Sequence, residues 1–315
     1  MPLNVISNMC FSCIAAVILL GGTYATAETF GPPKTSLRLV GQLGTAARVV
    51  DQSSDIAATE LRFSPSLSAQ GRVEWQNADG RQIYLDPGIT VNLFPSQTDL
   101  NEARLSLFGE YRFNLTPERD KQIRLRTGIE RLSRFPDERF IRYTAQGALR
   151  VRHARGRSSI YTLRYRYRDQ NEANSFDGFD QNELFGSVRY AWAPPQGRVE
   201  QIAVTPYFDL RDAEGQNFSY DEFGVRVQSR YRLRSDVTLN ASARAFVRDY
   251  KDVFSAVFPI ERNDTRTAFE VELRKAYSPD TSFFTAVGWE TNRSNIPVRD
   301  YQGLTLRFGI EVTLR

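Results

Sequence analysis

Cysteine, histidine and methionine are almost absent from this 315-residue chain. Cys10 and Cys13 are the only Cys residues, both Met residues also lie within the first 13 positions, and His153 is the only His. One His and no later Cys exclude a His/Cys metal cluster and a Cys nucleophile. Carboxylate metal sites stay open by composition, but no set of residues stands out as one. We therefore expect no metal site, no cofactor and no catalytic residue.

Lysine is also scarce. Of 41 Lys and Arg residues only four are Lys, so 37 are Arg, and the formal net charge is +4. The aromatic content of 12% argues against a disordered chain. The mean hydropathy of -0.43 is too low for a bundle of membrane helices. The chain is long enough for one large domain or two ordinary ones.

Residues 1–27 have the pattern of an export signal. A short apolar stretch over residues 13–20 is followed by Ala25, Thr26 and Ala27, just before Glu28. A short apolar core ending in small residues is typical of a cleaved secretory signal, and it is too short for a dependable membrane span. We predict cleavage after Ala27, which would leave a mature chain without Cys and therefore without disulfides.

From residue 36 onward, apolar residues recur with a period of two. In the last segment Leu304, Leu306 and Phe308 alternate with Thr305 and Arg307. Because side chains alternate across a strand, such a segment has one apolar face and one charged face. We predict about fourteen strands (12–16 possible), over residues 36–50, 59–75, 81–94, 102–115, 122–133, 139–152, 159–168, 182–193, 199–211, 220–234, 237–249, 264–276, 281–292 and 301–314.

The connections between these strands alternate in length. Short turns follow every second strand, at residues 76–80, 116–120, 153–157, 193–197, 234–236 and 278–280. Most other connections are longer, and 169–180 and 250–263 are the longest. Short turns on one side and longer loops on the other are typical of outer-membrane barrels, and an even strand number lets the last strand pair with the first. A soluble sandwich would show turns every 8–12 residues and a propeller a repeat of about 40 residues, and neither is found.

The fold class predicted is therefore all-β, a closed antiparallel transmembrane β-barrel over residues 36–315 in the bacterial outer membrane, preceded by a short periplasmic segment over residues 28–35. In this architecture the chain resembles porin-like bacterial outer-membrane proteins. The final strand, GLTLRFGIEVTLR, looks like the closing strand that the barrel assembly machinery reads. The segment SNIPVRDY before it is similar to the one that precedes the final strand in the barrel of surface lipoprotein assembly modifiers. The partners expected are outer-membrane lipid, lipopolysaccharide and the barrel assembly machinery; the oligomeric state stays open.

Function is predicted from the charged strand faces. If the apolar faces meet lipid, the arginines line the interior, where planar guanidinium groups would attract anions and exclude cations from a water-filled lumen. The chain would then be a passive porin-like channel for small anionic or hydrophilic solutes. The candidate pore-lining residues are Arg124, Arg126, Arg142, Arg150, Arg152, Arg164, Arg166, Arg168, Arg226, Arg230, Arg232 and Arg234.

Three other functions stay open. Arg–Glu networks could plug a purely structural barrel, or the barrel could serve export or assembly together with periplasmic partners, as the resemblance to the modifiers implies. A lipid-modifying enzyme would need a Ser/His pair facing the outer leaflet, whereas His153 falls in a turn on the opposite side. Nucleic-acid binding is not expected, because the arginines are spread along strands and not gathered in one patch. We therefore predict a non-enzymatic protein.

Overall fold

The alternating segments of the sequence form long antiparallel strands in the computed structural model, which describes residues 30–49, 59–96, 98–134, 137–154, 156–171 and 178–315. The predicted signal peptide, the first two residues of the segment 28–35 and the middle of the connection 169–180 lie outside these described residues. The strands are β1 (Lys34–Val49), β2 (Thr59–Phe63), β3 (Ser66–Gln76), β4 (Gln82–Asn92), β5 (Glu102–Asn114), β6 (Lys121–Arg134), β7 (Asp137–Ala154), β8 (Arg157–Gln170), β9 (Gln181–Trp192), β10 (Val199–Ala213), β11 (Tyr220–Arg232), β12 (Val237–Val253), β13 (Glu261–Ala276), β14 (Thr281–Ser294) and β15 (Tyr301–Leu314).

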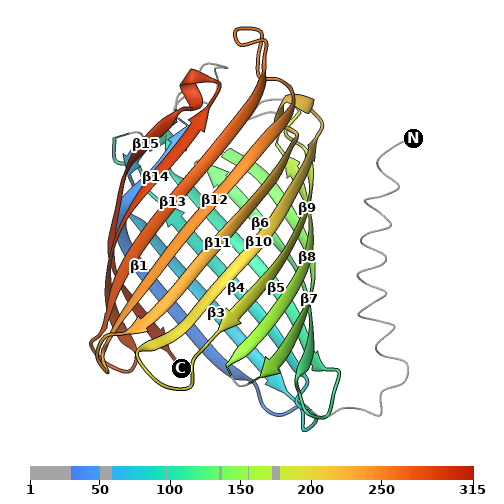
Figure 1. Ribbon diagram of the computed structural model, residues 1–315, viewed down its shortest axis with the longest axis vertical. Helices are drawn as coiled ribbons and strands as arrows, with labels where there is room; N and C mark the ends of the chain where they lie inside the picture. Colours follow the sequence, from blue (N-terminus) through green and yellow to red (C-terminus); the bar gives the residue numbers. More distant parts are fainter. Residues whose placement is uncertain (1–29, 50–58, 97, 135–136, 155, 172–177) are drawn as a thin grey trace.

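The sheet closes on itself into a barrel of tilted strands (Figure 1). From β3 to β15 each strand pairs with the next, and β15 pairs with β1 in a register that sets Leu37 opposite Leu314 and Gly44 opposite Arg307. The short strand β2 pairs with the far end of β1, and β3 pairs with its near end. Since β2 and β3 share one place in the wall, the barrel has fourteen strands. The predicted closed, all-β barrel is confirmed.

One predicted strand, 59–75, is interrupted in the structure. It is divided into β2 and β3 by Ser64 and Pro65. Proline has no backbone N–H to donate to a ladder, so the pairing loses one donor at Pro65. The neighbouring groups are still paired, because the Ser64 N–H donates to the Gly44 carbonyl at 2.7 Å and the Leu93 N–H donates to the Pro65 carbonyl at 2.8 Å.

The two ends of the barrel differ as predicted. Six short turns join β3 to β4, β5 to β6, β7 to β8, β9 to β10, β11 to β12 and β13 to β14 at one end, and this turn end also holds the start of β1 and the end of β15. Most connections at the other end, the loop end, are longer, although β6 ends at Arg134 and β7 already begins at Asp137. The loop end also carries the short 3-10 helices η1 (Thr98–Leu100), η3 (Gln216–Phe218) and η4 (Pro297–Arg299). No helix in the described part of the chain is long and apolar enough to cross a membrane.

The long connection predicted at 250–263 is wrong. Strand β12 continues to Val253 and β13 begins at Glu261, and these two residues face each other across the pair, so only residues 254–260 connect them. The physical reason is an irregularity in register between Asp249 and Val253, which lets the two strands pair again beyond it.

The outer surface of the barrel is apolar. Along β15, Leu304, Leu306 and Phe308 are 49%, 47% and 52% exposed, whereas Arg307 and Glu311 on the other face form ion pairs. A closed barrel pairs the backbone groups of every strand and leaves no free sheet edge, which is what a chain needs in order to cross lipid. The apolar belt therefore faces the bilayer and the charged faces surround the lumen.

Candidate functional site: the barrel lumen

The lumen wall is built from every second residue of each strand. On β8, Tyr161 and Leu163 are 45% and 56% exposed on the outer surface, so Arg164, Arg166 and Arg168 face inward. The same alternation places inward all the predicted arginines that lie on strands β6, β7, β8 and β11: Arg124, Arg126, Arg142, Arg150, Arg152, Arg164, Arg166, Arg168, Arg226, Arg230 and Arg232. Arg234 differs, because β11 ends at Arg232 and Arg234 lies in the following turn.

One buried carboxylate gathers three of the inward arginines. Glu183 of β9 lies 2.7 Å from Arg164, 3.3 Å from Arg166 and 3.2 Å from Arg211 of β10, and only 8% of its side chain is exposed. The Arg164 guanidinium also lies over the ring of Phe185, 4.3 Å from its centroid. This cluster ties β8, β9 and β10 together across the lumen face.

A second cluster surrounds Glu222 of β11, whose side chain is 1% exposed. Arg244 donates to it at 2.8 Å, Arg248 donates to it at 2.5 and 2.9 Å, and the Tyr207 hydroxyl donates to it at 2.9 Å. The Arg248 guanidinium stacks on Tyr220, 4.1 Å from the ring centroid. Aromatic rings and guanidinium groups therefore fill the lumen side of the wall here.

The sequence reasoning missed Arg211, Arg244 and Arg248. The signal was present, since Arg244 and Arg248 alternate with Ala243 and Val247 along β12. The outward residues there are small, however, so the apolar stripe that would have marked the strand face is weak.

Several other inward carboxylates pair with further arginines. Glu130 binds Arg142 at 2.9 Å, and Arg126 reaches both Glu110 and Asp86 at 3.3 and 3.5 Å. Where the barrel closes, Glu311 of β15 bridges Arg38 of β1 and Arg274 of β13, each at 2.7 Å, and Arg307 binds Glu270 at 2.5 Å. Positive and negative charges balance around this closure.

The predicted arginines on strands divide into two groups by partner. Six have a carboxylate within 4.0 Å: Arg126, Arg142, Arg164, Arg166, Arg230 and Arg232. The other five have none among the described residues: Arg124, Arg150, Arg152, Arg168 and Arg226. Of these five, Arg168 stacks on Phe140 at 4.1 Å and donates to Gln170, and Arg124 donates to Gln122 at 3.0 Å.

Burial of the inward residues changes along the axis. On β11 the inward side chains pass from buried Glu222 through half-buried Gly224 to exposed Arg226, Arg230 and Arg232 at the turn end. On β7 they pass in the same direction from buried Phe140 to exposed Arg152. On these two strands the lumen wall is therefore packed near the loop end and open to solvent near the turn end.

Two charged groups outside the strands have perturbed pKa values. Burial, followed by repulsion from Arg262, lowers the pKa of Arg299 in η4. A hydrogen bond from the Thr116 hydroxyl lowers the pKa of Asp120 in the turn between β5 and β6.

The only His contacts a serine. The His153 Nε2 lies 2.8 Å from the Ser159 Oγ, where β7 and β8 approach their turn, and Ser159 is 5% exposed. Both residues fall on the outward faces of their strands, next to Val151 and Tyr161. No carboxylate or amide among the described residues orients the His153 ring, which a hydrolytic triad requires. In the same part of the chain, no three or more His, Cys, Asp or Glu residues are grouped so that they could hold a metal ion.

Comparison with known proteins connects this architecture to others. No protein-family model matches the chain, and no curated protein matches it in sequence. Solved structures do match: a loop-deletion mutant of OmpT, an outer membrane protein of Vibrio cholerae, is 11% identical, with 90% of this chain and 99% of that chain covered and a TM-score of 0.50. The fold is that of bacterial outer-membrane β-barrel proteins.

Two other solved structures are an outer membrane channel from Pseudomonas putida (10% identity, 93% and 98% covered, TM-score 0.47) and an anion-selective porin from Comamonas acidovorans (8% identity, 89% and 100% covered, TM-score 0.42). At such identities the likeness concerns the fold alone. Together with the apolar outer surface and the charged interior, this fold locates the protein in the outer membrane.

Proposed function

We propose that the protein is a passive, porin-like channel whose arginine-lined lumen favours small anionic or hydrophilic solutes. The observation that carries the proposal is the set of inward guanidinium groups without a carboxylate partner, above all Arg150, Arg152 and Arg226. Guanidinium groups stay protonated, so these three keep a full positive charge on the wall. In a confined lumen such charge raises the local anion concentration and repels cations.

The paired arginines have a different role in this proposal. In the Glu183 and Glu222 clusters, positive and negative groups neutralise each other in part and hold neighbouring strands together. They contribute less to selectivity than an unpaired arginine does. Selectivity should therefore follow the unpaired set and not the number of arginines in the lumen.

The test is a reversal potential in planar lipid bilayers under a salt gradient. The variant Arg150→Gln/Arg152→Gln/Arg226→Gln removes three unpaired lumen charges and should move the reversal potential toward the value of a non-selective pore. The control is Arg131→Gln, which removes a charge from a half-exposed side chain on the outward face of β6, paired with Glu138. It should leave the reversal potential unchanged. A cation-preferring wild-type channel, or an unchanged reversal potential in the triple variant, would refute the proposal.

A structural barrel with a closed lumen is the second candidate, and the packing at the loop end favours it. Glu222, Phe94 and Ile296 there are each at most 1% exposed. Such a barrel predicts no conductance in wild type and a conductance that appears when the Glu222 cluster is broken. An export or assembly barrel likewise predicts no conductance without its periplasmic partners. Steady conductance of the purified wild-type protein separates the channel from both.

A further inference from the structure

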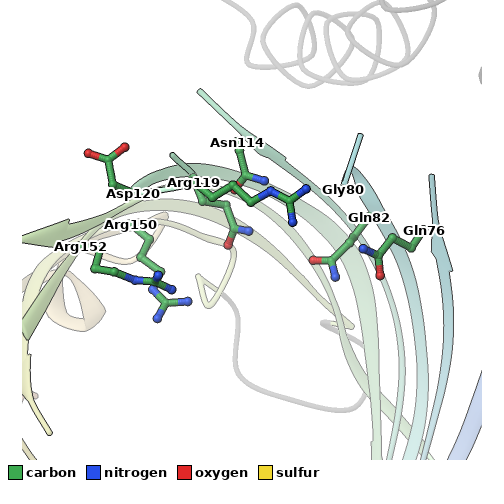
Figure 2. Close-up of a pocket in the computed structure, with 9 residues that line it drawn as sticks. Gln76, Gly80, Gln82, Asn114, Arg119, Asp120, Arg150 and Arg152 are labelled. Atoms are coloured by element: carbon green, nitrogen blue, oxygen red, sulfur yellow. The ribbon is translucent and has the colours of Figure 1, made fainter. Parts of the chain in front are cut away.

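A pocket of about 190 Å³ lies in the lumen wall at the turn end. We call it the turn-end pocket; it is lined by Gln76, Gly80, Gln82, Asn114, Arg119, Asp120, Gln122, Arg150 and Arg152 (Figure 2). A cavity needs only about 10–15 Å³ to admit one water molecule, so this one has room for a polyatomic anion. Its lining comes from strands β3 to β7, from the turn between β3 and β4 and from the turn between β5 and β6.

The charged groups of the turn-end pocket are mostly positive. Arg150 and Arg152 alternate on β7 and extend side by side into the lumen, as Figure 2 shows. Arg112 and Arg189 are also near enough to repel Arg150. Asp120 is the one carboxylate of the lining; it accepts a hydrogen bond from Thr116 and is turned away from the two guanidinium groups. Two like charges held next to each other without an acidic partner are stabilised by an anion between them.

The third arginine is held in place by the backbone. Arg119 has a φ of 56°, the only positive φ of a non-glycine residue among those described. This left-handed conformation is unfavourable for a side chain with a Cβ. It lets the Arg119 guanidinium lie over Gly80 of the neighbouring turn, where a Cβ would be 3.5 Å from the Arg119 Cζ. The Arg119 N–H donates to the Thr116 carbonyl at 3.0 Å, which closes the turn. Because the strained backbone brings the Arg119 guanidinium to the pocket, a role in ligand binding would explain the strain.

Amide side chains complete the lining. The Gln122 carbonyl oxygen accepts from Arg124 at 3.0 Å, which directs its amide NH₂ group to another acceptor. Asn114 and Gln76 add further amide groups on the lumen side of their strands, whereas the Gln82 amide already donates one hydrogen bond to Glu74 at 3.3 Å. Neutral N–H donors between guanidinium groups suit an anion with several oxygens better than a planar carboxylate, which a single guanidinium fork already satisfies.

We propose that the turn-end pocket is a binding site for a phosphate group, carried by a small solute or present as the free ion. The inference rests on the proposed function only in that the open lumen gives the solute access to the pocket. Arg150 and Arg152 bind the phosphate oxygens from the wall, Arg119 binds from the turn, and the amides donate to the remaining oxygens. Bound there, the anion occupies the periplasmic mouth of the lumen.

The test uses inorganic phosphate, pyrophosphate and a hexose phosphate, each titrated against folded protein in detergent by calorimetry. Binding in wild type should weaken about tenfold or more in Arg150→Gln/Arg152→Gln, because charge-assisted contacts are lost. The control Arg226→Gln removes an unpaired lumen charge outside the pocket and should bind like wild type. Acetate and methanesulfonate should bind much more weakly than pyrophosphate. Tighter binding of the hexose phosphate than of inorganic phosphate identifies a carried phosphate, and the reverse order identifies the free ion.

A second variant distinguishes a loss of binding from a failure to fold. Arg119→Gly removes the third guanidinium and relieves the left-handed backbone, so it should fold at least as well as wild type while binding pyrophosphate more weakly. Equal binding by wild type, Arg119→Gly and Arg150→Gln/Arg152→Gln would overturn the site. Binding that Arg226→Gln abolishes equally would show general attraction by the lumen charge and would also overturn it.

The calorimetric result is independent of conductance. If the protein binds pyrophosphate in the turn-end pocket but carries no current, the proposed site is supported and the proposed channel function is refuted. If the wild-type protein is an anion-selective channel but binds none of the three phosphates, the proposed channel function is supported and the proposed site is refuted. In a conducting protein, pyrophosphate should reduce the current at lower concentration when it is added from the turn end than from the loop end.

Discussion

Neutralising Glu222 should destabilise the barrel far more than neutralising an exposed carboxylate. Glu222 accepts hydrogen bonds from Tyr207, Arg244 and Arg248 at 2.5–2.9 Å and is 1% exposed. In the variant Glu222→Gln the side chain keeps its shape and one acceptor, but the two guanidinium groups lose their counter-charge. The Arg248 side chain, which is 20% exposed and lies among aromatic rings, is then left desolvated without an ionic partner.

The magnitude follows from the number and burial of the contacts. A hydrogen bond to a charged group contributes about 1.5–3 kcal/mol, and breaking a buried ion pair costs about 3–5 kcal/mol. Arg244 is 37% exposed and can regain water, so its share of the loss is discounted. We expect Glu222→Gln to lower the free energy of unfolding by about 3–4 kcal/mol.

The assay is urea unfolding of the protein in lipid vesicles, followed by tryptophan fluorescence. The matched control is Glu138→Gln, which also neutralises one glutamate paired with an arginine, but in a pair whose side chains are 26% and 54% exposed. A pair as exposed as this contributes about 0–1 kcal/mol. If the two variants lose equal stability, the Glu222 cluster does not support the wall and the reasoning is refuted.

Replacing Phe308, which is 52% exposed midway along the outer face of β15, by Arg should lower the free energy of unfolding in vesicles by about 2–4 kcal/mol. The substitution Thr305→Arg, on the inward face of the same strand, should lower the free energy of unfolding by less. A larger loss for Thr305→Arg than for Phe308→Arg would show that the outer face does not meet lipid. Replacing His153 by Ala should leave single-channel conductance unchanged, because its contact with a serine lies on the outward faces of β7 and β8; a lipid-hydrolysing activity lost in this variant would reveal a catalytic pair. Replacing Thr116 by Val should raise the pKa of Asp120, which the threonine hydroxyl lowers in wild type. A lowered pKa of Asp120 stabilises the folded state at pH values above the ordinary carboxyl pKa, and this stabilisation is lost as the pH falls through the pKa of the folded protein. An NMR titration that gives Asp120 the same pKa in both proteins would contradict this.

The strands were predictable because one face of each meets lipid. An apolar residue at every second position over eleven or more residues is a strong signal, and in β15 and β8 it is nearly uninterrupted. The break at Pro65 was not predicted, and proline alone does not mark one, because Pro87 and Pro206 lie within β4 and β10. On β12 the outward residues Ala241, Ala243 and Ala245 are small, so the alternation weakens, and the inward arginines of that strand were missed.

The pairing of charges was not predictable in the same way. Whether Arg126 reaches Asp86, two strands away, depends on the registers of β4, β5 and β6 together. Irregular registers, such as the one between Val199 and Gln201, shift a strand by a residue at places that the sequence does not mark. The sequence therefore predicts strands whose arginines share one face, whereas the division into paired and unpaired groups requires the structure.

That division explains why a nearly neutral chain uses arginine and almost no lysine. Arg244 donates to Glu222 and to the Tyr207 hydroxyl at 2.8 Å each, while its guanidinium lies over Phe246, 4.7 Å from the ring centroid. A planar group with five donors can bridge and stack at once, and a compact ammonium cannot. In the turn-end pocket, Arg150 and Arg152 have no carboxylate within 4.0 Å among the described residues, so their donors and their charge are available to an anion. Arginine can thus hold the wall together where a carboxylate lies close and attract an anion where none does, so the position of the carboxylates decides which role each arginine has.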